Sequence, residues 1–173
     1  MGAKRIAVIS SSEFLSITKD RVAGYKEALK AHGIEANDDY IHYSFYSGMD
    51  FSEIEAIINK LFTLKQKPDA ILTTSDKITT GVLKTLKRRG IKIPDDVALA
   101  GFSNTDIPEL IDPPMTIVRQ PSREMGEAAV NLLLQLIESK RPVKEFEKRM
   151  LSPELQVRAS SMGKKKATRK TSK

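Results

Sequence analysis

Short apolar runs alternate with longer amphipathic stretches along this chain. Runs rich in β-branched residues predict strands at 5–10, 40–45, 69–74, 97–102, 116–118 and 154–158. Apolar positions with helical spacing predict helices at 16–31, 52–64, 77–89 and 122–138. Strands that alternate with helices of this length indicate an α/β fold, an open and mostly parallel sheet with helices on both faces.

Residues at the ends of these helices indicate where they begin and stop. Gly33 supplies a stop for the first helix, and Ser52 with Glu55 three positions later has the spacing of a capping box. Asp76 is placed to cap the helix that follows it, and Ser122 is the expected cap of the last helix.

Four polar segments follow the predicted parallel strands, at the point where each strand ends. They are Ser10–Phe14, Ser44–Ser47, Thr74–Asp76 and Phe102–Asp106. In open α/β sheets, ligands bind beyond the carboxyl ends of the strands, where the strand order reverses. A crevice lined by hydroxyl, amide, carboxylate and guanidinium groups, with aromatic rings nearby, suits a polyhydroxylated small molecule.

Composition excludes several kinds of catalytic site. The chain has 173 residues, enough for one domain, with no cysteine and only two histidines, His32 and His42. Thiol nucleophiles, disulfides and His-rich metal clusters are therefore ruled out. The sequence contains no phosphate-binding loop, no GxGxxG, no GxSxG and no apolar stretch of membrane-spanning length. We expect no catalytic residues, no metal and no cofactor.

Carboxylates leave one enzymatic alternative open. Glu13, Asp76 and Asp106 could converge at the carboxyl edge of the sheet, and two of them could then perform acid–base chemistry. The other interpretation is structural, because Asp caps helices well and Asp106 precedes a turn.

The positive charge is concentrated at one end of the chain. The formal net charge is +7, of which residues 162–173 contribute +6, so the remaining body is nearly neutral. This tail is too polar to pack, and we expect it to be disordered. It either attracts polyanions nonspecifically or serves as a solubilising terminus.

Arg21 is a cation in the first turns of a predicted helix, where it opposes the helix dipole. Its guanidinium could reach over the crevice and bind ligand oxygens. Alternatively, it is a solvated surface residue beside Asp20.

Several stretches together resemble the LacI/GalR family of bacterial transcription regulators. Residues 69–104, DAILTTSDKITTGVLKTLKRRGIKIPDDVALAGFSN, are similar to a strand, an Asp-bearing loop, a helix and the entry to the next strand in that family. MTIVRQPSREMGEAAVNLLLQLI at 115–137 resembles the segment that crosses between lobes, and DRVAGYKEAL at 20–29 resembles the family's R-x-x-G-[FYW] helix. The resemblance extends from Lys4 to Ser161.

The resemblance implies a division of the chain into parts of a two-lobed sensor with a periplasmic-binding-protein-like fold. Residues 4–112 and 150–160 correspond to the C-terminal lobe, and 113–149 to a crossing strand and return helix of the first lobe. The chain is then a fragment that lacks the DNA-binding headpiece and most of the first lobe. The apolar stripe of the return helix would lack its cover, which favours association.

The resemblance also implies a set of ligand-binding residues. Arg21 matches an arginine that contacts the effector in the family. Asp76 matches an Asp or Asn at the mouth of the crevice, and Gln120 matches a polar residue of the crossing strand. The family usually has Asp where this chain has Ser103, so that position and its neighbour Asn104 are expected to bind more weakly. The candidate set is completed by Ser12, Phe14 and a stacking ring from Phe45 or Tyr46.

As a function, the resemblance implies the effector-sensing portion of a cytoplasmic, LacI-type repressor. In this interpretation, a small molecule such as a sugar binds between the lobes and changes the affinity for operator DNA. The DNA is bound only through the headpiece. The intact protein is expected to be a homodimer with no membrane association. The alternative is a fragment of a periplasmic sugar-binding protein of a transporter. An α/β enzyme is a third hypothesis, and measurable catalysis lost on substitution of Asp76 would favour it.

Overall fold

The computed structural model describes residues 2–139 and 147–163. Most of the basic tail predicted at 162–173 therefore lies outside the described residues. The strands are β1 (Ile6–Ser10), β2 (Ile41–Tyr43), β3 (Ala70–Thr73), β4 (Ala98–Phe102), β5 (Thr116–Arg119) and β6 (Glu154–Gln156). The helices are α1 (Ser16–Ala31), α2 (Phe51–Thr63), α3 (Asp76–Arg88) and α4 (Ser122–Glu138), with short 3-10 turns at Asp38–Tyr40 and Ala159–Ser161.

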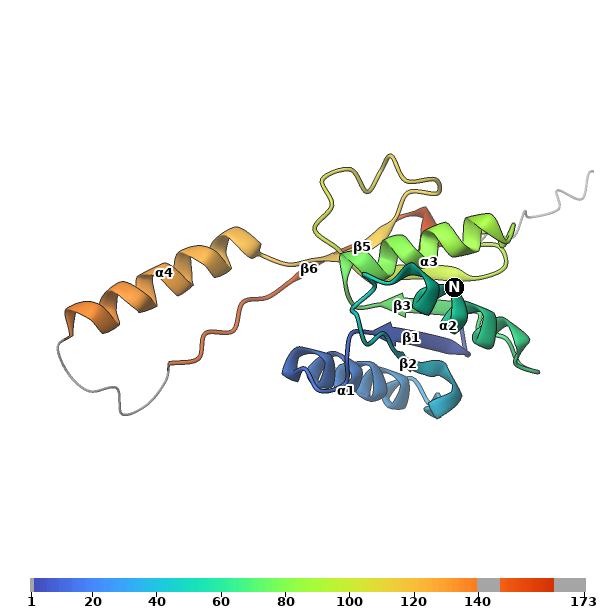
Figure 1. Ribbon diagram of the computed structural model, residues 1–173, viewed down its shortest axis with the longest axis horizontal. Coiled ribbons are helices and arrows are strands. Elements are labelled where there is room, and N and C mark those ends of the chain that lie inside the picture. Colours follow the sequence, from blue (N-terminus) through green and yellow to red (C-terminus); the bar gives the residue numbers. More distant parts are fainter. Residues whose placement is uncertain (1, 140–146, 164–173) are drawn as a thin grey trace, which may run out of the picture.

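The strands form one sheet in the order β2-β1-β3-β4-β5-β6 (Figure 1). The first five are parallel, and β6 runs antiparallel to β5. This arrangement confirms the predicted open, mostly parallel α/β sheet. Because β2 lies on one side of β1 and β3 on the other, the strand order reverses at β1, and the loops after β1 and β3 flank the switch point.

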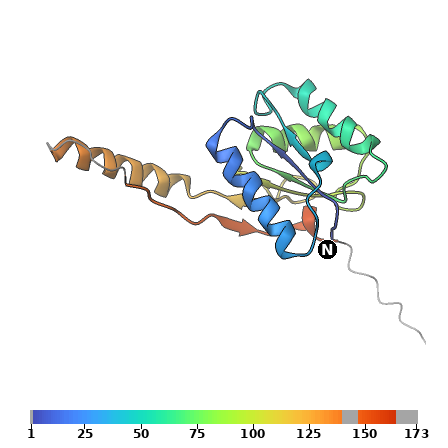
Figure 2. The same cartoon turned by 90° about the horizontal axis from the view of Figure 1, so that it is seen from below.

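Helices cover both faces of the sheet (Figure 2), as the alternation of elements predicted. On one face α2 and α3 bury their apolar stripes against the sheet; the fully buried side chains there include Ile54, Ile58, Leu61, Ile78, Val82 and Leu86. On the other face α1 packs with Tyr25 and Leu29 against Val8. Burial of these side chains, at about 1.5–3 kcal/mol each, fixes the register of the sheet and hence the position of its loops.

Three predicted helix caps are wrong. Asp50, not Ser52, caps α2 and accepts a hydrogen bond from Ser52 N at 2.9 Å. Ser75 caps α3, because its backbone is extended while Asp76 is already helical. Ser122 is likewise the first residue of α4 rather than its cap. Where several capping residues adjoin, sequence alone does not tell which one keeps an extended backbone.

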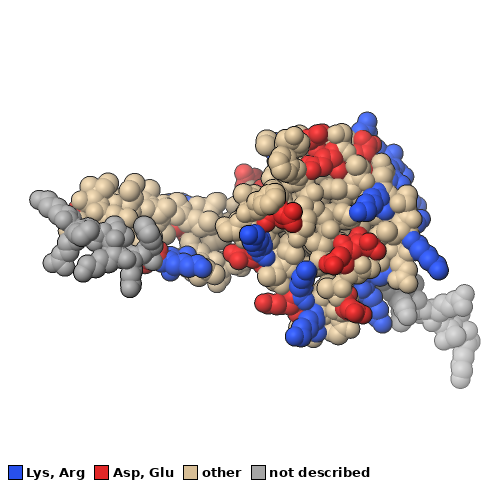
Figure 3. Space-filling model, turned by 60° about the horizontal axis from the view of Figure 1, so that its bottom comes forward, with Lys and Arg blue, Asp and Glu red and all other residues tan. Residues whose placement is uncertain are grey.

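Helix α4 projects away from the rest of the molecule as an arm (Figure 1). No residue of α4 is buried, although its sequence is strongly amphipathic. The large apolar side chains exposed on it are Met125, Val130, Leu133, Leu134, Leu136 and Ile137. Charged side chains are sparse on the surface of the arm and frequent on the surface of the body (Figure 3). An exposed apolar surface of this kind is typical of an interaction site.

Among the described residues, none of the helices has both the length and the apolar character needed to cross a membrane.

Candidate functional site

The loops at the switch point are held together by hydrogen bonds. Ser44 N donates to Ser10 O at 2.8 Å, and Thr74 N donates to Ile9 O at 3.2 Å. The buried hydroxyls of Ser10 and Thr74 are 2.7 Å apart and hydrogen-bonded. The segments that follow β1, β2 and β3 thus form a single edge, as the parallel topology predicts.

Arg21, in the second turn of α1, reaches over this edge rather than into solvent. Its Nη1 donates to Thr74 O at 2.5 Å and its Nη2 to Gln120 Oε1 at 2.7 Å. The guanidinium carbon lies 4.3 Å from the centroid of the Phe102 ring, a cation–π contact. The side chain is half-buried, and burial lowers the pKa of the guanidinium from its ordinary value. The guanidinium of an arginine keeps its proton in proteins, so Arg21 presents a positive charge at this edge.

The positive charge of Arg21 has no carboxylate partner among the residues that the structure describes. Its two hydrogen-bond partners, the Thr74 carbonyl and the Gln120 amide, are neutral. A partly desolvated cation that is held by neutral acceptors remains able to bind oxygens of a ligand.

Asp76, Ser103 and Asn104 form the adjoining part of the edge. The buried Ser103 hydroxyl donates to Asp76 Oδ1, and Asn104 N lies 3.3 Å from the same carboxylate oxygen. The carboxylate itself is exposed at the mouth, so further donors can reach it.

Asn104 links that group to the start of α4. Its Nδ2 donates to Gln120 O at 3.0 Å and to Ser122 Oγ at 3.1 Å, while its Oδ1 accepts from Gln120 N at 2.9 Å. Arg21, Gln120, Asn104, Ser103 and Asp76 are therefore joined through consecutive hydrogen bonds. We refer to these five residues as the crevice network.

Three predicted site residues lie outside the crevice network. Phe14 and Phe45 are 76% and 64% exposed, and the Phe45 ring contacts the Tyr46 ring with the centroids 5.1 Å apart. The carbonyl of Ser12 accepts from Leu15 N in the turn before α1. Their roles toward a ligand stay predictions.

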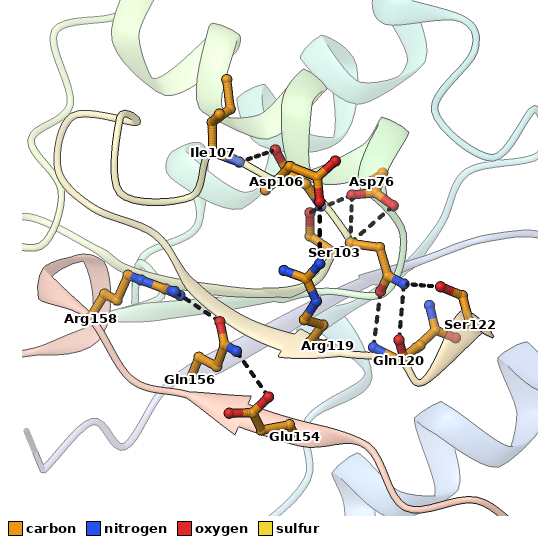
Figure 4. A network of polar contacts seen from close by, with 12 residues as sticks. Asp76, Ser103, Asp106, Ile107, Arg119, Gln120, Ser122, Glu154, Gln156 and Arg158 are labelled. Atoms are coloured by element: carbon orange, nitrogen blue, oxygen red, sulfur yellow. Dashed lines mark hydrogen bonds and ion pairs between the residues drawn. The ribbon is translucent and has the colours of Figure 1, made fainter. Parts of the chain in front are cut away.

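The carboxylates considered for acid–base chemistry are engaged separately. Asp76 accepts from Ser103 and Asn104, whereas Asp106 pairs with Arg119 at 3.2 Å on the exposed surface (Figure 4). No group of three or more metal-ligating carboxylates and histidines occurs in the described part of the chain.

Both histidines are bound to backbone carbonyls. His32 Nδ1 lies 2.8 Å from Ala28 O at the end of α1. His42 Nε2 lies 3.1 Å from Asp39 O, and burial lowers the pKa of that imidazole. Neither contact presents a histidine to the crevice network.

Four contacts at this edge were not predicted from the sequence, although Thr74 and Phe102 lie in segments that were predicted to form it. The Thr74 carbonyl and the Phe102 ring hold Arg21, and Ser122 holds Asn104. Glu53 binds the loop after β2 from the first turn of α2. Phe102 belongs to a predicted edge segment, and what the sequence did not predict is the contact of its ring with Arg21. No sequence signal identifies which backbone carbonyl an arginine will reach.

A family model described as "Periplasmic binding protein-like domain" matches residues 1–161. The chain belongs to this family. The repressor CytR of Escherichia coli (strain K12), described as an HTH-type transcriptional repressor, is 35% identical over 133 residues, which are 77% of this chain and 38% of that protein.

Solved structures agree with this assignment. A putative LacI transcriptional regulator from Bacillus cereus subsp. cytotoxis NVH 391-98 aligns with a TM-score of 0.80 and 30% identity, over 94% of this chain and 56% of that one. A complex of the transcriptional regulator CelR with cellobiose aligns with a TM-score of 0.81 and 30% identity, over 92% of this chain and 47% of that one. The periplasmic-binding-protein-like chain therefore corresponds to the sensor part of LacI-type regulators, and it spans less than half the length of the curated relatives it matches.

Proposed function

We propose that this chain is the effector-sensing part of a LacI-type transcription repressor, and that the crevice network binds a small polyhydroxylated effector such as a sugar. The observation that carries the proposal is the convergence of Arg21, Asp76, Ser103, Asn104 and Gln120 at the switch point of the sheet. The network presents a cation, an exposed carboxylate and amide groups, which donate to and accept from hydroxyl groups. CelR, which was solved as a complex with cellobiose, supports a sugar as the ligand class.

The two-lobed arrangement is part of this proposal. Residues 4–112 and 150–160 form the C-terminal lobe, and α4 returns into the other lobe, where its exposed apolar face would be covered. The complete absence of buried residues in α4 supports this assignment. An effector that binds one orientation of the lobes better than another shifts the equilibrium between them.

Operator binding belongs, in this proposal, to a helix-turn-helix part outside these 173 residues. The curated relatives are HTH-type repressors of which the chain matches 38–46%, which supports that placement. A homodimer would present two headpieces, and coupling between effector and operator then requires two sites and two states. The relatives are repressors rather than transport proteins, which favours a regulator over a periplasmic sugar-binding protein.

The proposal is tested by a screen of ribose, glucose, cellobiose and adenosine with saturation-transfer NMR, which detects weak binding to half of a crevice. Asn104→Ala should abolish the signal of the compound that binds, because the Asn104 side chain makes three hydrogen bonds that join two loops. Arg123→Ala is the matched control, since that side chain is exposed and, within the described part of the chain, pairs only with Glu127. A bound compound whose signal survives Asn104→Ala would contradict the proposed site.

A further inference from the structure

The exposed aromatic side chains of the described residues are confined to one edge of the molecule. They are Phe14, Tyr43, Phe45 and Tyr46, which end or follow β1 and β2. The remaining described aromatic residues are buried or partly buried. Rings exposed singly are ordinary on a protein surface, but a group restricted to the mouth of a crevice offers a flat apolar face to a ligand.

The segment Ser44–Gly48 is here called the aromatic loop. Packing of its aromatic side chains does not hold it in place. Phe45 is 64% exposed and Tyr46 is 54% exposed, and the two rings contact each other edge to face with an interplanar angle of 85°. Side chains so exposed contribute little packing against the body of the protein. The place of the rings must therefore come from the backbone that carries them.

Glu53 binds that backbone. Its Oε1 accepts from Phe45 N at 2.5 Å, and its Oε2 accepts from the Ser44 hydroxyl at 2.6 Å and lies 3.3 Å from Tyr46 N. One carboxylate thus engages three successive residues of the aromatic loop. Hydrogen bonds to a charged acceptor are about twice as strong as those between neutral groups.

The geometry of α2 directs Glu53 at the loop. Asp50 caps the helix through Ser52 N, which places Glu53 in the first turn. A carboxylate is favourable there, because the backbone N–H groups and the helix dipole are positive at that end. In an ordinary capping box such a glutamate reaches back to its own cap residue. Glu53 reaches the aromatic loop instead.

The two ends of the aromatic loop are fixed independently. Ser44 is fully buried, donates its N–H to Ser10 O, and accepts from Gly48 N at 2.8 Å through its hydroxyl. Gly48 has a φ of +82° and packs against the start of α3, where a Cβ would lie 2.6 Å from Ile78 N. Between these ends, Ser47 N donates to Ser44 O at 3.1 Å and Met49 N donates to Tyr46 O at 2.9 Å, and the contacts of Glu53 join residues 44–46 to α2.

We propose that Glu53 is a positioning residue of the effector site, which holds the aromatic loop so that the Phe45 and Tyr46 rings form a wall for the flat face of a ring-shaped ligand. The ligand part of this inference rests on the proposed function, whereas the loop geometry rests on the contacts of Glu53 alone. Glu53 acts through the two rings and does not itself touch the ligand.

The first test measures how firmly the aromatic loop is held when no ligand is present. The chain has no tryptophan, so Phe45→Trp introduces a single fluorescent reporter on the aromatic loop. Adding Glu53→Gln should raise the acrylamide quenching constant of this reporter about twofold and lower its anisotropy, at temperatures well below the unfolding midpoint. Glu55→Gln is the matched control, because it removes the same charge from the same helix at a side chain for which no hydrogen bond or ion pair is found among the described residues.

A purely structural role for Glu53 makes a different prediction. Glu53→Gln would then lower the thermal midpoint while leaving quenching and anisotropy of the reporter unchanged in the folded protein. That result, or an equal effect of Glu55→Gln, would overturn the proposal.

The second test uses cellobiose as the probe in a double-mutant cycle on the chain without the reporter. Glu53→Gln should weaken cellobiose binding about tenfold in the parent chain and have no further effect in a Phe45→Ala/Tyr46→Ala background. A tenfold loss in both backgrounds would show that Glu53 does not act through the rings. Failure of the parent chain to bind cellobiose would exclude cellobiose as the effector, and the proposal on Glu53 would then stand or fall on the fluorescence test.

Discussion

The guanidinium of Arg21 donates a hydrogen bond to Gln120 Oε1 at 2.7 Å, across 99 positions of the sequence. Arg21 belongs to α1, which packs on the sheet, whereas Gln120 lies in the connection from β5 to the projecting α4. The contact therefore joins the body of the lobe to the segment that leaves it. Arg21 is thus connected directly to the point from which α4 projects.

The first prediction concerns the contribution of Arg21 to binding. In a protein with both lobes, Arg21→Ala should weaken effector binding by about 1.5–3 kcal/mol, the value of a lost charged hydrogen bond. This corresponds to roughly a 10–150-fold rise in Kd, measured by isothermal titration calorimetry. Lys19→Ala removes an exposed positive charge from the same helix and should leave the Kd unchanged. Equal effects of the two substitutions would place Arg21 outside the site.

The second prediction concerns Ser103, which lies where the LacI/GalR family usually has Asp. Ser103→Asp places a second carboxylate within hydrogen-bonding reach of Asp76, at a side chain that is only 3% exposed. Two neighbouring carboxylates raise the pKa of one of them in the folded state, so the variant should lose about 1–3 kcal/mol of stability at neutral pH.

The pH dependence of this variant follows from the sign of that shift. Because the raised pKa makes the folded state bind more protons than the unfolded state, stability falls as pH rises through the raised value. The loss should therefore disappear as pH is lowered from about 7 toward about 4, near the unfolded pKa of Asp. Urea unfolding across this range measures the effect, with the neutral isostere Ser103→Asn as the control. A loss independent of pH would indicate a steric cause.

The architecture was predictable from the sequence because burial imposes periodicity. The helices at 16–31 and 122–138 were predicted with the bounds that the structure has. The strand predicted at 40–45 was too long, since Asp38–Tyr40 forms a 3-10 turn before a strand of three residues. At the other end the strand stops at Tyr43, because Ser44 and Phe45 bond to Glu53 in the loop that follows.

The site was predictable only in part. The residues of the crevice network lie at predicted strand ends, and their grouping followed from the topology together with the family resemblance. The contacts within the network did not follow. Thr74 binds Arg21 through its backbone carbonyl, and Glu53 binds a loop rather than its own helix cap. Neither contact can be predicted from residue type or spacing.

The third prediction concerns Gly48. Its φ is positive, and a Cβ added at this position would lie 2.6 Å from Ile78 N, so Gly48→Ala should destabilise the chain by about 1–3 kcal/mol. Gly24→Ala is the opposite case, because Gly24 lies within α1 with open space around it, and this substitution should gain up to about 1 kcal/mol. Chemical denaturation of both variants measures the difference. An equally stable Gly48→Ala would contradict the close packing of the aromatic loop on α3.

The fourth prediction concerns the exposed face of α4. The chain should self-associate through this face, since six large apolar side chains lie uncovered on it, Met125, Val130, Leu133, Leu134, Leu136 and Ile137. Leu133→Lys should lower the weight-average mass in sedimentation equilibrium toward that of the 19.3 kDa monomer. Gln135→Lys adds the same charge at an exposed polar position of α4 and should leave the association unchanged. A parent chain that is monomeric at high concentration would contradict an interaction role for this face.

The central claim is that the carboxyl edge of the sheet, and no other surface, binds the effector. Mapping of backbone amide shifts by ¹H–¹⁵N NMR during titration with ribose, glucose and cellobiose tests it most directly. We expect shifts at Arg21, Asp76, Ser103, Asn104 and Gln120, and at the neighbouring loop residues. Shifts confined to the apolar groove beside α1, which is lined by Leu72, Ala98 and Ala100, would contradict this account.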